Sequence, residues 1–229
     1  MKKQIVAMSS VALALGVAFA NAGTLTTQSK KTSYAMGYET GKAMLGHHIK
    51  LDQQAYALGL KEGLGGKSLS MSESQIKATL IAFQKKSMAQ FKAKMNKESL
   101  KNLLSGKEFL AKNKTVKGVK VTHSGLQYLV MSKGTGPVPT LKDTVTVDYA
   151  GMLINGNVFD SSYKRGQKAT FPVSAVIKGW QEALTMMHVG STWKIFVPAK
   201  LAYGKMGAPG AIGPNETLIF KVHLYSIKK

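Results

Sequence analysis

Apolar residues repeat with a helical period in the first half of the chain and with a strand period in the second half. Between Ser74 and Lys112 they recur at spacings of three, four and eight, with no proline and one glycine. Such a stripe marks one face of an α-helix, and about 40 residues at ~1.5 Å each give a rod of ~60 Å. We therefore predict a long connecting helix over residues 70–113. It begins at Ser70 or Ser72, because each has a Glu or Gln three residues later, as in a capping box. The stripe comprises Ile76, Leu80, Phe83, Phe91, Met95, Leu103 and Leu110.

The residues before the long helix predict two short helices rich in glycine. The first spans Ser33–Leu45, and Asp52 is expected to cap the second. A glycine inside a helix costs about 1 kcal/mol relative to alanine, and two short helices bury too little apolar surface to fold alone. We therefore predict that residues 23–69 form a dimerisation region and that the protein is a homodimer. Two frayed helices with no partner are the alternative.

After residues 114–125, which are predicted to be a linker, the apolar period changes from about 3.6 to about 2 residues. Alternating segments predict antiparallel strands, and Ser174 is expected to cap one short helix over Ala175–Thr185. This combination defines an α+β fold over residues 126–229, with an antiparallel sheet wrapped on the helix. The predicted strands are Leu126–Val130, Thr144–Ile154, Thr170–Val173, Ser191–Val197 and Thr217–Ile227.

The stretch Val147–Tyr163 is typical of a strand, a tight turn and a returning strand. An Asn-Gly pair at 155–156 separates two apolar runs, and both residues tolerate the positive φ of a type I′ turn. The hairpin would bring Tyr149, Phe159 and Asp160 near one another. A hydroxyl, a ring and a carboxylate at the mouth of a half-apolar cleft indicate a binding site with few proton-transfer groups.

Composition and charge limit the kinds of site and partner that the chain can have. The chain contains no cysteine, which excludes disulfides, thiolate nucleophiles and cysteine-based zinc sites. The histidines lack metal-binding spacing and the common nucleotide-binding motifs are absent, so neither a metal nor a cofactor is expected. Lys and Arg number 32 against 11 Asp and Glu, a formal charge of +21. Because this excess favours anionic surfaces, we expect electrostatic contact with acidic polymers of the cell envelope.

Residues 1–22 are predicted to be a signal peptide. Lys2 and Lys3 precede an apolar run from Ile5 to Phe19, and small residues at 18, 20 and 22 fit the pattern that signal peptidase cleaves after. The run is shorter than the ~20 residues of a membrane span, although an uncleaved anchor is the alternative. Export argues against nucleic acid as a partner. It predicts a protein of the periplasm, of the outer membrane or cell surface, or of the medium.

Short motifs in the second half carry a resemblance to a known family. The fragments VDYAGML, NGNVFDSS, VIKGWQEAL, GSTWKIFVP, LAYG and IGPNETLIFKVHLYSIKK, in this order, resemble FKBP-type peptidyl-prolyl cis/trans isomerases. With an exported helical segment and a long helix in front, the chain resembles the macrophage infectivity potentiator (Mip) group of that family. The resemblance implies an FKBP-like domain, proline-containing polypeptides as substrates, and macrolides such as rapamycin as inhibitors.

The resemblance also implies a set of site residues. Tyr149, Asp160 and Tyr203 match catalytic positions. The hydroxyl of Tyr203 and the backbone N–H of Ile177 match groups that bond a ligand carbonyl, and Trp180 matches the indole that floors the pocket. The substrate-binding positions are Phe159, Arg165, Val176, Ile177, Trp180, Ile212 and Phe220.

Three alanines depart from the family pattern. Ala169 stands where many members have an aromatic residue, Ala208 replaces a common histidine, and Ala211 replaces a branched apolar residue. These changes affect the rim of the pocket and therefore the peptide preference. Considered without the family, Phe220 would be a core residue, and Asp160 could simply cap a turn.

Peptide-bond isomerisation fits this chemistry. Rotation about the C–N bond has a barrier of about 18–20 kcal/mol, and X–Pro bonds populate both isomers. Catalysis needs no nucleophile or metal, only a pocket that binds the twisted amide better than the planar forms. We therefore predict an exported isomerase that assists the folding of envelope or secreted proteins. The alternative is a chaperone or surface adhesin that uses the FKBP domain mainly as a binding module, with Met-rich helices holding its clients.

Overall fold

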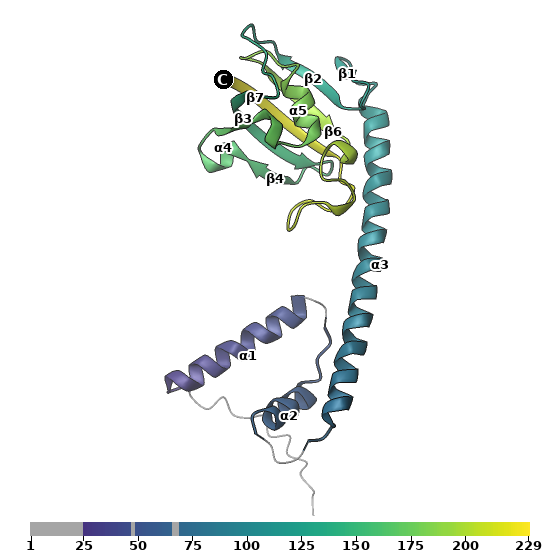
Figure 1. The fold of residues 1–229 in the computed structure, drawn as a ribbon, viewed down its shortest axis with the longest axis vertical. Coiled ribbons are helices and arrows are strands. Elements are labelled where there is room, and N and C mark those ends of the chain that lie inside the picture. Colours follow the sequence, from purple (N-terminus) through teal and green to yellow (C-terminus); the bar gives the residue numbers. More distant parts are fainter. Residues whose placement is uncertain (1–24, 47–48, 66–68) are drawn as a thin grey trace, which may run out of the picture. The chain divides into compact units, whose positions relative to one another are not determined.

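The computed structural model describes residues 25–46, 49–65 and 69–229, so the predicted signal peptide lies outside the described residues (Figure 1). The chain divides into two compact units, Met1–Ile76 and Lys77–Lys229. Within the described ranges, none of the helices is both long enough and apolar enough to cross a membrane.

The first unit contains two short helices, α1 (Gln28–Gly46) and α2 (Gln53–Gly63). The first is longer than predicted, and neither helix has a buried residue. Asp52 caps α2 as predicted, because its carboxylate accepts a 2.9 Å hydrogen bond from the backbone N–H of Ala55. The apolar side chains of both helices are therefore left without a core in this unit.

A capping box begins the long helix α3 (Glu73–Asn113, 41 residues). The Ser72 N–H donates to the side chain of Gln75 over 2.9 Å, and the Gln75 N–H donates to the Ser72 hydroxyl over 3.3 Å. Ser70 does not cap the helix, because its N–H and hydroxyl donate to the carboxylate of Glu62 over 2.9 and 2.6 Å. Of the two predicted starts, the structure selects Ser72.

The second unit joins the greater part of α3 to an antiparallel sheet of seven strands (Figure 1). The strand order is β1-β2-β6-β7-β3-β4, and β5 also pairs with β3. This sheet and its short helix confirm the predicted α+β class. The bounds are β1 Val119–Val121, β2 Gln127–Ser132, β3 Thr144–Leu153, β4 Val158–Ser161, β5 Ala169–Pro172, β6 Thr192–Val197 and β7 Leu218–Lys228.

The segment predicted to be a linker contains a strand that the sequence analysis did not predict. β1 pairs with β2, with Val119 opposite Leu129. Three residues of mixed polarity are too short to show an alternating pattern, so the pairing comes from the neighbouring strand rather than from local periodicity. Residues 114–125 therefore belong in part to the sheet.

The last turns of α3 pack on the sheet. Gly106 is buried, and a Cβ atom built there would lie 2.3 Å from the hydroxyl oxygen of Thr217. The rings of Phe109 and Phe196 have centroids 5.9 Å apart. The side chain of Gln127 also donates to the Leu110 carbonyl over 2.9 Å. The helix is thus more than a connecting rod, because its end belongs to the second unit.

The short helix α5 (Lys178–Leu184) supplies the centre of the core. Its start corrects the prediction that Ser174 caps a helix from Ala175: residues Val173–Ala175 form a separate 3₁₀ turn, η1, and Ile177 precedes α5 without a side-chain cap. The core cluster joins helix residues to inward-facing strand residues. Its members include Trp180, Ala183, Leu184, Val145, Val147, Ile195, Leu218, Val222 and Leu224.

The hairpin between β3 and β4 lies where it was predicted, but the type I′ turn was wrong. A type I′ turn needs positive φ at both central residues, whereas Gly156 has φ +87° and Asn155 is not among the positive-φ residues of the described chain. The Leu153 carbonyl accepts from Gly156 N–H over 3.0 Å, and Leu153 N–H donates to the Asn157 carbonyl over 2.9 Å. This is a three-residue loop with glycine in the left-handed region. The Asn155 side chain accepts from Asn157 N–H over 2.9 Å and stabilises it.

Candidate functional site

Most of the predicted site residues come from elements that meet at one end of the core helix. Tyr149 lies on β3, Phe159 and Asp160 on β4, and Phe220 on β7. Arg165 ends the short helix α4 (Ser162–Arg165). Val176 and Ile177 directly precede α5, which carries Trp180, while Tyr203 and Ile212 belong to the loop between β6 and β7.

Trp180 is the centre of an aromatic cluster. Its ring contacts Tyr149 and Phe220 edge to face, each with centroids 5.3 Å apart and planes at 89°. Phe159 packs edge to face on Phe220, with centroids 5.7 Å apart. Edge-to-face geometry is the arrangement that aromatic quadrupoles prefer. With 4% of its surface exposed, Trp180 is buried at the centre of this cluster.

Two further residues complete this cluster and were not singled out by the sequence analysis. Phe171 on β5 lies 5.7 Å from Trp180, centroid to centroid. A Cβ atom built on Gly151 would lie 2.7 Å from ring atoms of both Phe159 and Phe220. Only glycine lets both rings approach β3. The alternating pattern around Phe171 was a usable signal, whereas nothing local marks Gly151.

A polar network stands beside the aromatic rings. The Tyr149 hydroxyl donates to one carboxylate oxygen of Asp160, and the guanidinium of Arg165 donates to the other. A second guanidinium nitrogen of Arg165 donates to the Tyr149 oxygen over 3.0 Å, and the charged group lies 5.5 Å from the centre of that ring. The three side chains therefore hold one another in a closed triangle.

The network sets the protonation of its members. Burial by itself would raise the pKa of Asp160, but the hydrogen bonds from Tyr149 and Arg165 outweigh it and lower the pKa below its usual value. Burial, and then the hydrogen bond to Asp160, raises the pKa of Tyr149. At neutral pH the site therefore presents a carboxylate and a protonated phenol.

A buried serine fixes the backbone behind this triangle. Ser162 is fully buried, and its hydroxyl donates to the Asp148 carboxylate over 2.7 Å. The same oxygen accepts from the Tyr149 N–H over 2.9 Å. Asp160 was considered as the cap of a turn, but the residue that caps the short helix α4 is Ser161, whose hydroxyl accepts from the Lys164 N–H over 3.4 Å. Strand β3 and the start of α4 are thereby tied together.

The segment before α5 is also held in place. The Gln181 side chain donates to the carbonyls of Val176 and Ser174 over 2.7 and 3.1 Å. The Ile177 carbonyl accepts from the N–H groups of Trp180 and Gln181 over 2.9 and 3.1 Å. Val176 and Ile177 both pack against the core.

The loop between β6 and β7 contributes two predicted site residues, Ile212 and Tyr203. Ile212 is buried in the core cluster with Trp180 and Phe220, and it exchanges two backbone hydrogen bonds with Ala208. Tyr203 is 42% exposed. In the described part of the chain, no hydrogen bond or aromatic pair joins Tyr203 to the other predicted site residues. The contacts of the described residues thus join nine of the ten positions and do not include Tyr203.

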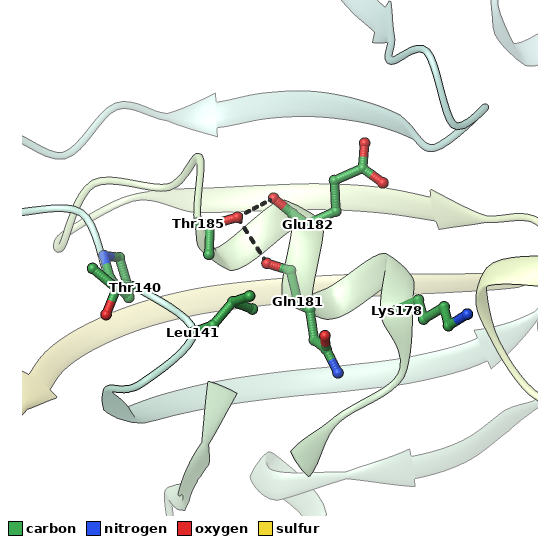
Figure 2. Close-up of a pocket in the computed structure, with 7 residues that line it drawn as sticks. Thr140, Leu141, Lys178, Gln181, Glu182 and Thr185 are labelled. Atoms are coloured by element: carbon green, nitrogen blue, oxygen red, sulfur yellow. Dashed lines mark hydrogen bonds between the residues drawn. The ribbon is translucent and has the colours of Figure 1, made fainter. Parts of the chain in front are cut away.

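A separate shallow pocket lies on the opposite side of α5 (Figure 2). It is lined by polar residues of that helix and by the segment before β3, and it contains none of the predicted site residues. Figure 2 shows the Thr185 hydroxyl, which donates to the carbonyls of Gln181 and Glu182 over 2.9 and 3.1 Å. The Thr185 hydroxyl is therefore already bonded within its own helix, while Lys178 and Glu182 supply charged groups of opposite sign to this pocket.

Comparison with known proteins places this chain in a family. Residues 136–225 match the profile described as FKBP-type peptidyl-prolyl cis-trans isomerase, and residues 29–130 match the profile of the domain amino terminal to it. The Coxiella burnetii protein named peptidyl-prolyl cis-trans isomerase Mip is 52% identical over all of both chains. The Legionella longbeachae protein named outer membrane protein MIP is 47% identical over 100% of this chain and 99% of its own.

A solved structure of a relative has a similar fold. The crystal structure of FkpA from Escherichia coli superposes with a TM-score of 0.69 at 38% identity, and the match covers 89% of this chain and 98% of that one. The chain belongs to the FKBP-type peptidyl-prolyl cis-trans isomerase family. It is an enzyme of that class, and its most similar relatives include Mip proteins.

Proposed function

We propose that the aromatic rings around Trp180 line a recess, and that this chain isomerises X–Pro bonds of exported polypeptides in it. The observation that carries the proposal is the juxtaposition of two surfaces: an edge-to-face aromatic wall and the triangle of Tyr149, Asp160 and Arg165 beside it. A proline ring needs an apolar, close-fitting receptacle, and the adjoining amide needs a few fixed polar groups.

The reaction requires differential binding and no bond-making chemistry. The planar amide is stabilised by resonance, so a site that favours the twisted form lowers the barrier. A million-fold acceleration corresponds to about 8 kcal/mol of such preference. The twisted amide has less charge separation than the planar one, so a recess lined by aromatic side chains favours it over water.

We assign the residues as follows. Trp180, Phe159 and Phe220 receive the proline ring, with Val176 and Ile212 at its sides. The Tyr203 hydroxyl and the Ile177 N–H bond the substrate carbonyl groups. The 42% exposure of Tyr203 supports this role, because it leaves the side chain accessible to a ligand. Asp160 acts through the field of its carboxylate on the carbonyl carbon.

Proton transfer has no part in this assignment. The lowered pKa of Asp160 keeps it ionised, and the raised pKa of Tyr149 keeps it protonated, throughout the neutral range. Tyr149 and Arg165 therefore serve to orient the carboxylate and to hold its charge. Asp160 needs both, because its side chain is partly exposed and would otherwise rotate toward water.

Export, dimerisation and envelope association complete the proposal. The basic and apolar start of the chain supports export, and a relative of similar length is named as an outer membrane protein. The absence of buried residues in α1 and α2 supports a dimer through residues 23–69, since their apolar side chains need a partner. The charge of +21 supports contact with acidic envelope polymers.

A chaperone or adhesin role is the second candidate, and one observation favours it. Tyr34, Met36 and Leu45 on α1 are all strongly exposed. Side chains of this kind adapt to varied apolar partners. If a dimer interface does not bury these side chains, they are available to bind client polypeptides.

The deciding experiment is isomerisation of a short X–Pro peptide by the chain lacking residues 1–22, with and without rapamycin. We expect an isomerisation rate well above the uncatalysed rate. Rapamycin should abolish this acceleration. A folded protein that binds rapamycin and gives no rate would overturn the catalytic assignment and favour the chaperone or adhesin.

A further inference from the structure

The loop between β6 and β7 lies next to α3 (Figure 1). Side chains of the helix and the loop together line a second apolar surface there. Two hollows of about 480 Å³ each share three side chains, Phe91, Met95 and Met206. Because they share a wall, they form one continuous surface, here named the α3 groove. All of its residues belong to the unit Lys77–Lys229.

The α3 groove presents its apolar side chains to solvent. Met206 is 87% exposed and Phe91 is 60% exposed, and Met88 beside them is also exposed. A contiguous exposed apolar surface bordered by polar residues marks a binding surface. Methionine side chains are unbranched and polarisable, so a surface rich in them fits many apolar sequences.

The groove is formed before any ligand arrives. The Asn102 side chain donates to the Pro214 carbonyl over 3.0 Å, and the Asn215 side chain donates to the Ser99 hydroxyl over 2.8 Å. These bonds fasten the late loop to α3. Gly207 has φ +66°, and a Cβ there would lie 2.3 Å from the Ile212 carbonyl. This turn carries Met206 outward from the loop.

The α3 groove shares a residue with the predicted proline site. Ile212 and Leu153 line its inner hollow. Ile212 is also a predicted substrate-binding residue, and it belongs to the buried cluster that contains Trp180 and Phe220. Ile212 therefore places the inner end of the groove next to the residues that are proposed to bind proline.

The charges at the two ends of the groove differ. Lys92 and Lys205 border the outer hollow, whereas Glu98 and Glu216 border the inner one. An acidic group is therefore favoured near the lysines and disfavoured near the glutamates. This polarity distinguishes a specific path from a general apolar patch.

We propose that the α3 groove binds the stretch of an unfolded polypeptide that adjoins the X–Pro bond, and that it prefers apolar residues with an acidic residue at the lysine end. The proposal rests on the proposed function for its account of what occupies the neighbouring recess. Its consequence is that long substrates bind more tightly than short ones to the same recess.

The test uses fluorescein-labelled peptides and the full chain without residues 1–22, with binding read by fluorescence anisotropy. One peptide is a short X–Pro tetrapeptide. Two others extend it by twelve residues of Leu, Phe and Glu, either before or after the tetrapeptide. In two matched peptides Lys replaces Glu. We expect one long Glu peptide to bind about tenfold more tightly than the tetrapeptide, and its Lys counterpart to bind several-fold more weakly.

Phe91→Ser and Met206→Ser are the test variants, and Phe83→Ser is the matched control. Phe83 is 46% exposed on the same helix and lines neither hollow. We expect each test variant to bind the long peptide about tenfold more weakly, which corresponds to the loss of one buried apolar side chain. The affinity of each test variant for the tetrapeptide should be unchanged. The control variant should bind the long peptide as tightly as the unsubstituted chain.

Three results would overturn the proposal: equal affinity for long and short peptides, an equal loss with Phe83→Ser, or a change in oligomeric state of Phe91→Ser on sedimentation. The last would assign the groove to a second copy of the chain. Isomerisation is measured separately. A chain that fails to isomerise but shows the expected anisotropy pattern would refute the proposed function and retain the groove.

Discussion

Tyr149 on β3 and Asp160 on β4 are joined by a hydrogen bond from the phenol to the carboxylate, although they stand 11 residues apart in the chain. Arg165 closes the triangle from the short helix that follows β4. If the carboxylate acts through its field, its direction matters as much as its charge. The phenol and the guanidinium each hold one oxygen of that carboxylate.

Tyr149→Phe removes the hydroxyl and keeps the ring against Trp180. We expect kcat/KM for a short X–Pro peptide to fall by about tenfold to a hundredfold, since hydrogen bonds to charged groups contribute about 1.5–3 kcal/mol. Tyr163→Phe is the control, because Tyr163 is exposed and lies outside the aromatic cluster. An unchanged rate in Tyr149→Phe would show that the phenol does not orient Asp160.

The pH dependence of stability should reveal the Asp160 interactions. Because its folded-state pKa lies below its unfolded value of about 3.9, its stabilising contribution is fully present above about pH 4 and is lost as pH falls through the lowered pKa. We expect Asp160→Asn to lower Tm at pH 7, and the difference from the unsubstituted chain to shrink as the pH is taken below 4.

Thermal unfolding followed by circular dichroism from pH 2 to pH 8 measures this difference. Asp143→Asn is a useful comparison, because hydrogen bonds from the backbone and side chain of Thr140 lower the pKa of Asp143, which is not one of the predicted site residues. Its Tm difference should follow the same pH trend, while the isomerisation rate stays unchanged. A Tm difference for Asp160→Asn that is constant across this range would contradict the lowered pKa.

Gly151 is predicted to be essential for the aromatic wall. The methyl group of Gly151→Ala would meet the rings of Phe159 and Phe220 at 2.7 Å. Overpacking of this kind typically costs about 1–3 kcal/mol, and displaced rings should also weaken rapamycin binding. Gly41→Ala is the control for rapamycin binding, because a Cβ there meets nothing within 4 Å; in urea it should stabilise rather than destabilise, because alanine is favoured over glycine inside a helix. Urea unfolding and rapamycin titration of both variants test the expectation.

Local patterns predicted the elements better than the contacts between them. The helical stripe and the Ser72 capping box placed α3 within a few residues, and the alternating segment from Thr144 placed β3. The hairpin position followed from its Asn-Gly pair, but the turn type depended on the Asn155 side chain, which bonds Asn157 rather than leaving the backbone free.

Some residues of the candidate site could likewise be predicted from local sequence, and others could not. The aromatic and polar positions were recoverable from motif order, whereas Gly151 and Phe171 act through cross-strand neighbours that no local window contains. The packing of α3 on the sheet was missed for a related reason. Gly106 looks like a weak point in a helix until Thr217, more than a hundred positions later, is placed against it.

The contact between Gly106 and Thr217 leads to a double-mutant test. Gly106→Ala should destabilise the second unit, because its methyl group would lie 2.3 Å from the Thr217 hydroxyl oxygen. Thr217→Ala removes that oxygen and should partly restore stability in the double variant. We expect a coupling energy of about 1–2 kcal/mol from urea unfolding of the four proteins. Additive effects would mean that the helix end shifts freely.

The oligomeric state tests the proposed role of the first unit. A fragment that begins at Lys77 keeps the α3 contacts with the sheet, whereas one that begins at Lys114 would uncover Phe196 by removing Phe109. We expect the chain without residues 1–22 to sediment as a dimer and the Lys77 fragment as a monomer, because residues 23–69 are proposed to hold the dimer. Both should isomerise a short peptide equally, since the recess lies wholly in the second unit. Only the dimer should gain affinity for clients with several prolines, through the raised effective concentration of its second recess. A dimeric Lys77 fragment would instead assign the interface to the second unit.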